Sequence, residues 1–130
     1  MDRAFLDANV LFSAAWMEDS GLARLWRLTE VTLIASRYAV GEAERNLDSD
    51  AQRARLHALA QKVMLVDAPD EATLPVGVEL VAKDVPILLA AIEARATHLL
   101  TGDRAHFGAL YGRKIGGVKI MAPAAYFKQR

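Results

Sequence analysis

Acidic residues stand beside short apolar segments at several points of this sequence. One carboxylate directly follows the apolar residues 4–6, and another closes a Thr-Gly-Asp turn after the short apolar run Leu99–Leu100. Two more lie near the starts of stretches with helical spacing. The four residues are Asp7, Glu42, Asp84 and Asp103. If the fold brings them together, their negative charges repel one another unless a cation compensates them, so the pattern predicts a metal site.

The available ligands indicate Mg²⁺ or Mn²⁺ rather than Zn²⁺. The four acids offer oxygen atoms, and the chain has no cysteine. Its histidines, His57, His98 and His106, are scattered and show neither HExxH nor His-x-His spacing. We expect His106 at the surface, with contact to a phosphate as the alternative.

Each acid also has a purely local interpretation. Asp7, Asp84 and Asp103 all occupy positions where a carboxylate can cap a helix, and Glu42 can be an exposed helix acid like its neighbour Glu44. The metal interpretation depends on their convergence in space.

The elements that must position these acids alternate along the chain. Short apolar or β-branched runs predict strands at 4–6, 31–36, 63–68, 97–100 and 117–122. Helical spacing predicts helices after Asp7, over 20–29, twice within 37–63 with a joint near 48–50, over 83–96 and from Pro123 onward. Residues 68–82 are expected to be mostly loop, with a short strand at 76–81 as an option.

Strands separated by helices predict a three-layer α/β/α sandwich with a mostly parallel sheet of five strands. Ligands of such sheets bind beyond the carboxyl ends of the strands. Asp7 and Asp103 follow strands directly. The helix that Asp84 begins runs antiparallel to the strands, so its start lies at the same edge, and Glu42 is expected near that edge too.

Composition narrows the protein class. A chain of 130 residues, 53% of them hydrophobic, is one domain with a full core. Without cysteines, long apolar runs or a basic-then-apolar start, we expect a cytoplasmic protein with no membrane segment. Residues 1–103 hold all 16 acids and ten basic residues, a net charge of −6, and 104–130 hold six basic residues and no acid. The basic end is either a phosphate-binding surface or a solvated tail.

Four segments together resemble the PIN-domain family of ribonucleases. They are "FLDANVLFSA", "GEAERNL", "KDVPILLAAIEARATHLLTGD" and "VKIMAPAAYF". Their order and spacing match over nearly the whole chain. The resemblance implies a single nuclease domain over residues 1–130, a parallel sheet in the order 3-2-1-4-5, and acids that bind Mg²⁺ or Mn²⁺.

Matched position by position, the resemblance implies that the catalytic acids are Asp7, Glu42, Asp84 and Asp103, with the metal on Asp7, Asp84 and Asp103. Asn9 and Thr101 fall where the family places polar residues that orient the acids. Lys83 and Arg104 stand close enough in sequence to the acids to contact flanking phosphates.

The function implied is metal-dependent hydrolysis of RNA phosphodiester bonds, with water activated by the metal and attacking in line. Many bacterial members of the family are toxins of toxin–antitoxin pairs, which implies a small antitoxin partner, and homodimers are common. A groove for the antitoxin is expected over residues 16–26, with simple core packing as the alternative.

Two other functions remain open. A catalytically weak or inactive module of the same fold would bind RNA or protein only. A phosphotransferase with an aspartate nucleophile at Asp7 normally needs a second aspartate two residues later, where this chain has Asn9. The sequence has neither a GxxxxGK[ST] phosphate loop nor a GxSxG serine elbow.

Overall fold

A computed structural model describes residues 1–70 and 72–130 of the chain. Within these described residues, six strands form one sheet. In chain order they are β1 (Asp2–Leu6), β2 (Val31–Ser36), β3 (Met64–Val66), β4 (His98–Leu100), β5 (Lys114–Ile115) and β6 (Val118–Met121). Their order across the sheet is β3-β2-β1-β4-β6-β5.

All neighbouring strands are parallel except β5 and β6, which form an antiparallel hairpin at one edge. The expected order 3-2-1-4-5 is confirmed for the parallel part, with β6 as its fifth strand. The sixth strand is the short β5. Two residues, Gly116 and Gly117, connect it to β6 with φ angles of 56° and 87°, a conformation that glycine adopts without steric cost.

Helices connect successive parallel strands, and one further helix follows the last strand. They are α1 (Ala8–Trp16), α2 (Arg37–Asn46), α3 (Asp50–Ala60), α4 (Val85–Glu93), α5 (Arg104–Phe107) and α6 (Pro123–Lys128), with 3-10 helices η1 (Gly21–Arg27), η2 (Ala82–Asp84) and η3 (Gly108–Leu110). The segment expected to be helical over 20–29 is therefore the 3-10 helix η1. No strand forms at 76–81; Val76 and Gly77 form a turn, and residues 78–81 have no regular secondary structure.

Local side-chain chemistry sets several helix starts. The Ser36 hydroxyl accepts a hydrogen bond from Ala39 N and begins α2 directly at the end of β2. Ser49 and Gln52 form a reciprocal capping box at the start of α3. Pro86 lies in the first turn of α4, where a missing N–H breaks no helical hydrogen bond.

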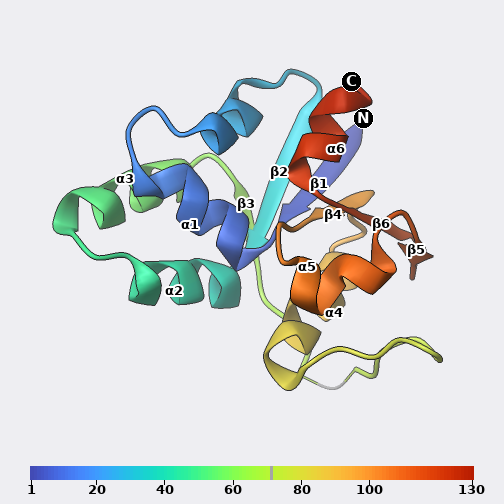
Figure 1. Ribbon diagram of the computed structural model, residues 1–130. Helices are drawn as coiled ribbons and strands as arrows, with labels where there is room; N and C mark the ends of the chain where they lie inside the picture. Colours follow the sequence, from blue (N-terminus) through green and yellow to red (C-terminus); the bar gives the residue numbers. More distant parts are fainter. Residues whose placement is uncertain (71) are drawn as a thin grey trace.

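The core follows the central strands. Ala4, Phe5 and Leu6 of β1 and Leu99 and Leu100 of β4 are fully buried, as expected for strands covered on both faces. Helix α1 packs against α2, α3 and η1, whereas α4 packs against β2 and β4 (Figure 1). The predicted α/β/α class with a mostly parallel sheet is confirmed.

The two chain ends lie side by side (Figure 1). The Tyr126 hydroxyl in α6 donates a hydrogen bond of 2.7 Å to the Asp2 carboxylate in β1. The described helices include none long and apolar enough to cross a membrane.

Candidate functional site

The carboxyl ends of β1, β4 and β6 meet at one edge of the sheet. Asp7 N donates to Leu100 O, and Thr101 N donates to Met121 O. The backbone hydrogen bonds between neighbouring strands therefore continue to the residues where β1 and β4 leave the sheet. This register places Asp7 beside the Thr101-Gly102-Asp103 turn, although 94 residues separate Asp7 from Thr101.

Asp7 caps α1 and is only 4% exposed. Its Oδ1 accepts a hydrogen bond of 2.7 Å from Ala8 N, and its Oδ2 accepts one of 2.7 Å from the Thr101 hydroxyl. Burial raises the pKa of Asp7 to about 6; the charges of Asp84 and Asp103 add to this effect, and the two hydrogen bonds oppose it.

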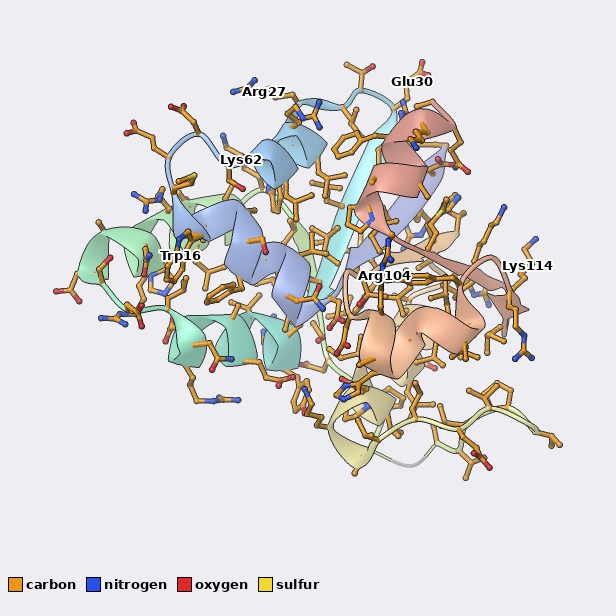
Figure 2. The ribbon with its side chains drawn as sticks, viewed as in Figure 1. Trp16, Arg27, Glu30, Lys62, Arg104 and Lys114 are labelled. Atoms are coloured by element: carbon orange, nitrogen blue, oxygen red, sulfur yellow. The ribbon has the colours of Figure 1, made fainter. Side chains whose placement is uncertain are left out.

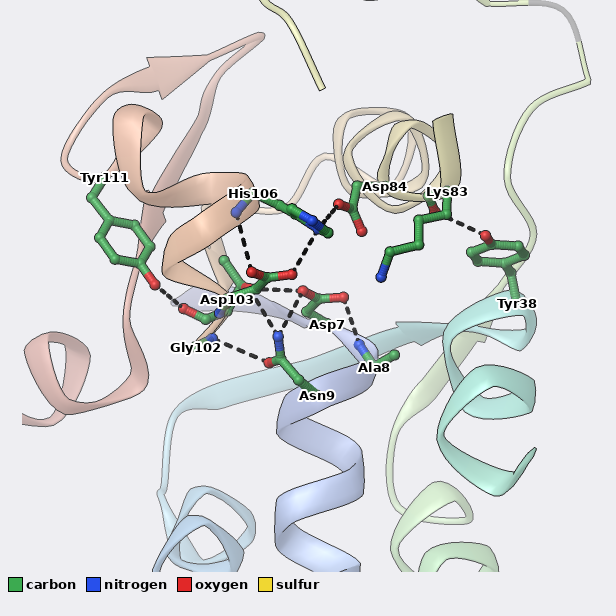
Figure 3. Close-up of polar contacts among 11 residues, drawn as sticks. Asp7, Ala8, Asn9, Tyr38, Lys83, Asp84, Gly102, Asp103, His106 and Tyr111 are labelled. Atoms are coloured by element: carbon green, nitrogen blue, oxygen red, sulfur yellow. Dashed lines mark hydrogen bonds and ion pairs between the residues drawn. The ribbon is translucent and has the colours of Figure 1, made fainter. Parts of the chain in front are cut away.

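Thr101 and Asn9 hold the edge of the site together. The buried Thr101 hydroxyl accepts a hydrogen bond from Asp103 N at 3.1 Å while donating to Asp7. The Asn9 side chain accepts from Gly102 N at 3.1 Å and donates to Asp7 Oδ2 at 3.3 Å (Figure 3). The positions of Asp7 and Asp103 are thus fixed relative to each other by side chains from both strand ends.

Asp84 enters from the other direction, at the junction of η2 and α4. It stands at the N-cap position of α4 but makes no side-chain capping bond, and it is 5% exposed. The local interpretation as a helix cap therefore fails for Asp84. It holds for Asp103, whose Oδ1 accepts a hydrogen bond from His106 N at 3.1 Å, and for Asp7.

The Asp84 carboxylate points toward the turn that carries Asp103. His106 lies between the two acids, with its Nδ1 2.7 Å from Asp84 Oδ2 and 2.9 Å from Asp103 Oδ2 (Figure 3). Ligand atoms from the three residues all lie within 4.8 Å of one another. Asp7 and Glu42 do not belong to this tight group.

A cavity of about 260 Å³ contains all four predicted acids. Its polar lining residues are Asp7, Asn9, Glu42, Asn46, Lys83, Asp84 and Asp103. Glu42 faces this cavity from α2, whereas Glu44 pairs with His57 on the outside. A hydrogen bond of 2.8 Å from the Tyr38 hydroxyl to Lys83 O ties α2 to the start of α4.

The predicted basic residues separate into two places. Lys83 lines the acidic cavity, whereas Arg104 lines a neighbouring groove of about 620 Å³. Asn9 and Asp103 line both hollows, so the two adjoin. Lys114, in contrast, projects from the edge strand β5 (Figure 2).

The position of His106 differs from the one predicted from the sequence. We expected the side chain at the surface, whereas the structure places the ring between two acids with 30% of the side chain exposed. The signal available was the spacing Asp103-x-x-His106, because residues three apart share a face at the start of a helix. For Tyr111, whose hydroxyl donates to Thr101 O at 2.7 Å, no sequence signal was present.

The arrangement can hold a divalent cation. Asp84, Asp103 and His106 converge at the end of a parallel sheet, with Asp7 in the adjoining cavity. Asp84 Oδ2 and His106 Nδ1 are buried without a hydrogen-bond partner among the described residues. Such atoms are energetically unfavourable unless they are satisfied by a bound species.

No protein-family model matches the chain, and no curated protein sequence matches it. Solved structures do. A chain in the crystal structure of VapBC2 from Rickettsia felis, bound to a DNA fragment from the promoter, superposes with a TM-score of 0.69 at 15% identity, covering 92% of this chain and 98% of that chain.

A chain in the structure of FitAB bound to an IR36 DNA fragment is also similar. Its TM-score is 0.53 at 18% identity, and the match covers 92% of this chain and 94% of that chain. At these identities the likeness demonstrates a shared fold.

Proposed function

We propose that residues 1–130 form a single PIN-like nuclease domain that hydrolyses RNA phosphodiester bonds with Mg²⁺ or Mn²⁺. The observation that carries this proposal is the convergence of Asp7, Asp84 and Asp103, which come from three separate parts of the chain and line one cavity. Three nearby carboxylates favour a bound divalent cation over three separate helix caps.

The polar residues of the site would have distinct roles in the reaction. Asp84 and Asp103, with Asp7 behind them, would hold the cation, and Thr101 and Asn9 keep Asp7 and Asp103 in place. When bound, a divalent cation lowers the pKa of a water molecule and offsets negative charge on the phosphate. Glu42, which lines the same cavity from α2, or Asp103 would orient the attacking water.

Two basic residues support a phosphate chain as the substrate. Lys83 lines the acidic cavity and Arg104 lines the adjoining groove. Consecutive phosphates of an RNA strand would therefore meet one basic side chain in each hollow. The remaining basic residues of 104–130 would add to the attraction without contacting the reacting phosphate.

We propose a toxin–antitoxin role, with a small antitoxin as the partner and the cytoplasm as the location. The support is the likeness of this chain to chains in the VapBC2 and FitAB structures. Both of those structures are bound to DNA fragments, and the fragment in the VapBC2 structure comes from the promoter. Trp16 and Met17, 40% and 54% exposed at the end of α1, offer an apolar contact for such a partner. A homodimer is a further proposal, and size measurement in solution tests it.

The nuclease proposal is tested by RNA cleavage in Mg²⁺ or Mn²⁺ with Asp84→Asn and Asp103→Asn. We expect each variant to lose at least about 100-fold in cleavage rate, because each removes a charge that holds the cation. Glu42→Gln should also lose activity, and Glu44→Gln is the matched control on the same helix that should retain it. Full activity in both aspartate variants would refute the assignment, and metal binding without any cleavage would favour the binding module.

A further inference from the structure

Within the part of the chain that the structure describes, three residues bring potential ligand atoms within 4.8 Å of one another, and His106 is the one among them that offers nitrogen. The other two, Asp84 and Asp103, offer carboxylate oxygens. Its Nδ1 approaches Asp84 Oδ2 at 2.7 Å and Asp103 Oδ2 at 2.9 Å (Figure 3). The backbone N–H of the same residue donates to Asp103 Oδ1, which fixes the first turn of α5 against the acid. The ring is therefore held over the space between the two carboxylates.

The contacts of this ring are close but lack hydrogen-bond geometry. Among the described residues, neither Asp84 Oδ2 nor His106 Nδ1 has a hydrogen-bond partner, although both atoms are buried. The Asp84 side chain is 6% exposed, so water does not readily satisfy it. Close approach without mutual alignment is the arrangement of ligand atoms that face a shared centre instead of one another.

We propose that His106 Nδ1 is a metal ligand together with Asp84 and Asp103, and that it makes the site select a first-row transition ion such as Mn²⁺ or Co²⁺ over Mg²⁺. This inference rests on the metal site of the proposed function and deepens it. Mg²⁺ takes oxygen ligands almost exclusively, whereas imidazole nitrogen binds transition ions with an affinity that rises from Mn²⁺ to Co²⁺. A site built from carboxylates alone has a weaker preference of this kind.

The other histidines provide matched controls. His57 pairs with Glu44 on the surface, and His98 contacts Thr97 and Gln129 at the opposite edge of the sheet. Neither belongs to the group of potential ligand atoms formed by Asp84, Asp103 and His106. The His106 side chain itself is partly exposed and lies outside the hydrophobic core, so its replacement leaves the packed interior intact.

The test is metal binding by the full chain in the absence of RNA, with His106→Gln and His57→Gln compared by calorimetric titration. We expect His106→Gln to lose about tenfold in Mn²⁺ affinity and more in Co²⁺ affinity, with Mg²⁺ affinity changed by less than about threefold. His57→Gln should match the unmodified protein for all three ions. An equal loss for Mg²⁺ and Co²⁺, or no loss for any ion, would overturn the proposal.

A spectroscopic readout needs no variant. With Mn²⁺ bound and the histidines labelled with ¹⁵N, pulsed electron paramagnetic resonance should detect one directly coordinated imidazole nitrogen. With Co²⁺ bound, the visible absorption spectrum should be that of a site with a nitrogen ligand. Absence of a coupled nitrogen would refute ligation by His106 even if RNA is cleaved. A coupled nitrogen without cleavage would instead refute the nuclease proposal and leave this inference standing.

Discussion

At the scale of single residues, Asp7 is held in a place that disfavours its own charge. It is buried at the end of β1, and the raised pKa follows from that burial and from two neighbouring acids. The hydrogen bonds from Ala8 and Thr101 offset only part of the effect. A cation in the cavity would offset the remaining cost of the Asp7 charge.

The metal-free protein should therefore gain stability when Asp7 becomes Asn. Since the folded-state pKa is raised from 3.8 to about 6, the wild-type protein loses stability as pH rises through this range. The loss is at most about 3 kcal/mol at pH 7, because a tenfold change in a proton-binding constant corresponds to roughly 1.4 kcal/mol. Urea unfolding in EDTA between pH 4 and 8 measures the difference between Asp7→Asn and wild type, which should grow with pH.

The control for this experiment is Asp67→Asn, because the Asp67 carboxylate is 76% exposed and forms only a surface ion pair with Arg37. It should change stability by less than about 0.5 kcal/mol at every pH. A gap between Asp7→Asn and wild type that stays constant from pH 4 to pH 8 would contradict the assigned cause.

At the scale of elements, the site is built from the starts of helices that follow strands. Asp7, Asp84 and Asp103 all occupy N-cap positions, yet Asp84 makes no capping bond and faces the cavity instead. The position of α4 therefore matters for the chemistry. Ile92 near its end contacts the β5–β6 hairpin, because a Cβ on Gly116 would lie 2.9 Å from Ile92 Cδ1.

The hairpin provides a matched pair of glycine variants. Gly116→Ala and Gly117→Ala both force alanine into a positive φ, which costs about 1 kcal/mol each. Only Gly116→Ala also collides with Ile92, so it should be the less stable of the two by about 1–2 kcal/mol. Urea unfolding measures both. Equal losses in the free energy of unfolding would show that Gly116 and Ile92 are not in close contact.

At the scale of the whole molecule, one cation would connect segments far apart in the chain. Asp7, Asp84 and Asp103 belong to β1–α1, η2–α4 and β4–α5, and these elements meet only in the folded state. An ion bound by all of them binds the folded protein in preference to the unfolded chain. Its binding free energy therefore adds directly to the free energy of unfolding.

Addition of Mn²⁺ should raise the melting temperature. At a free concentration 100 times the Kd the gain is about 2.7 kcal/mol, or roughly 8 °C for a domain of this size. Excess EDTA should reverse the shift. Differential scanning fluorimetry measures it, and Asp84→Asn should abolish it while Glu44→Gln leaves it unchanged. A shift of less than about a degree in the unmodified protein would favour separate helix caps over a metal centre.

Much of this architecture could be predicted from local patterns. Apolar runs such as 97–100 and capped helix starts such as that of α3 depend on neighbours in sequence, so strand and helix positions were predictable. The parallel arrangement followed because strands linked through helices need crossover connections, whereas the strand order came from the resemblance to the PIN-domain family. The hairpin strand β5 was not predicted, because only two residues form it and its pairing with β6 depends on the sheet edge already being present.

The sequence by itself determined that Asp7 and Asp103 each follow a strand, since turn chemistry and the alternation of elements are local. That these two strands pair with each other was implied only by the family resemblance. The tertiary structure alone decided that Asp84 leaves its helix uncapped, that Glu42 and not Glu44 faces the cavity, and that His106 lies between two acids. The physical reason is that a side chain's partner across the molecule depends on how α2, α4 and α5 pack around the strand ends. Sequence spacing limits this packing but does not specify it.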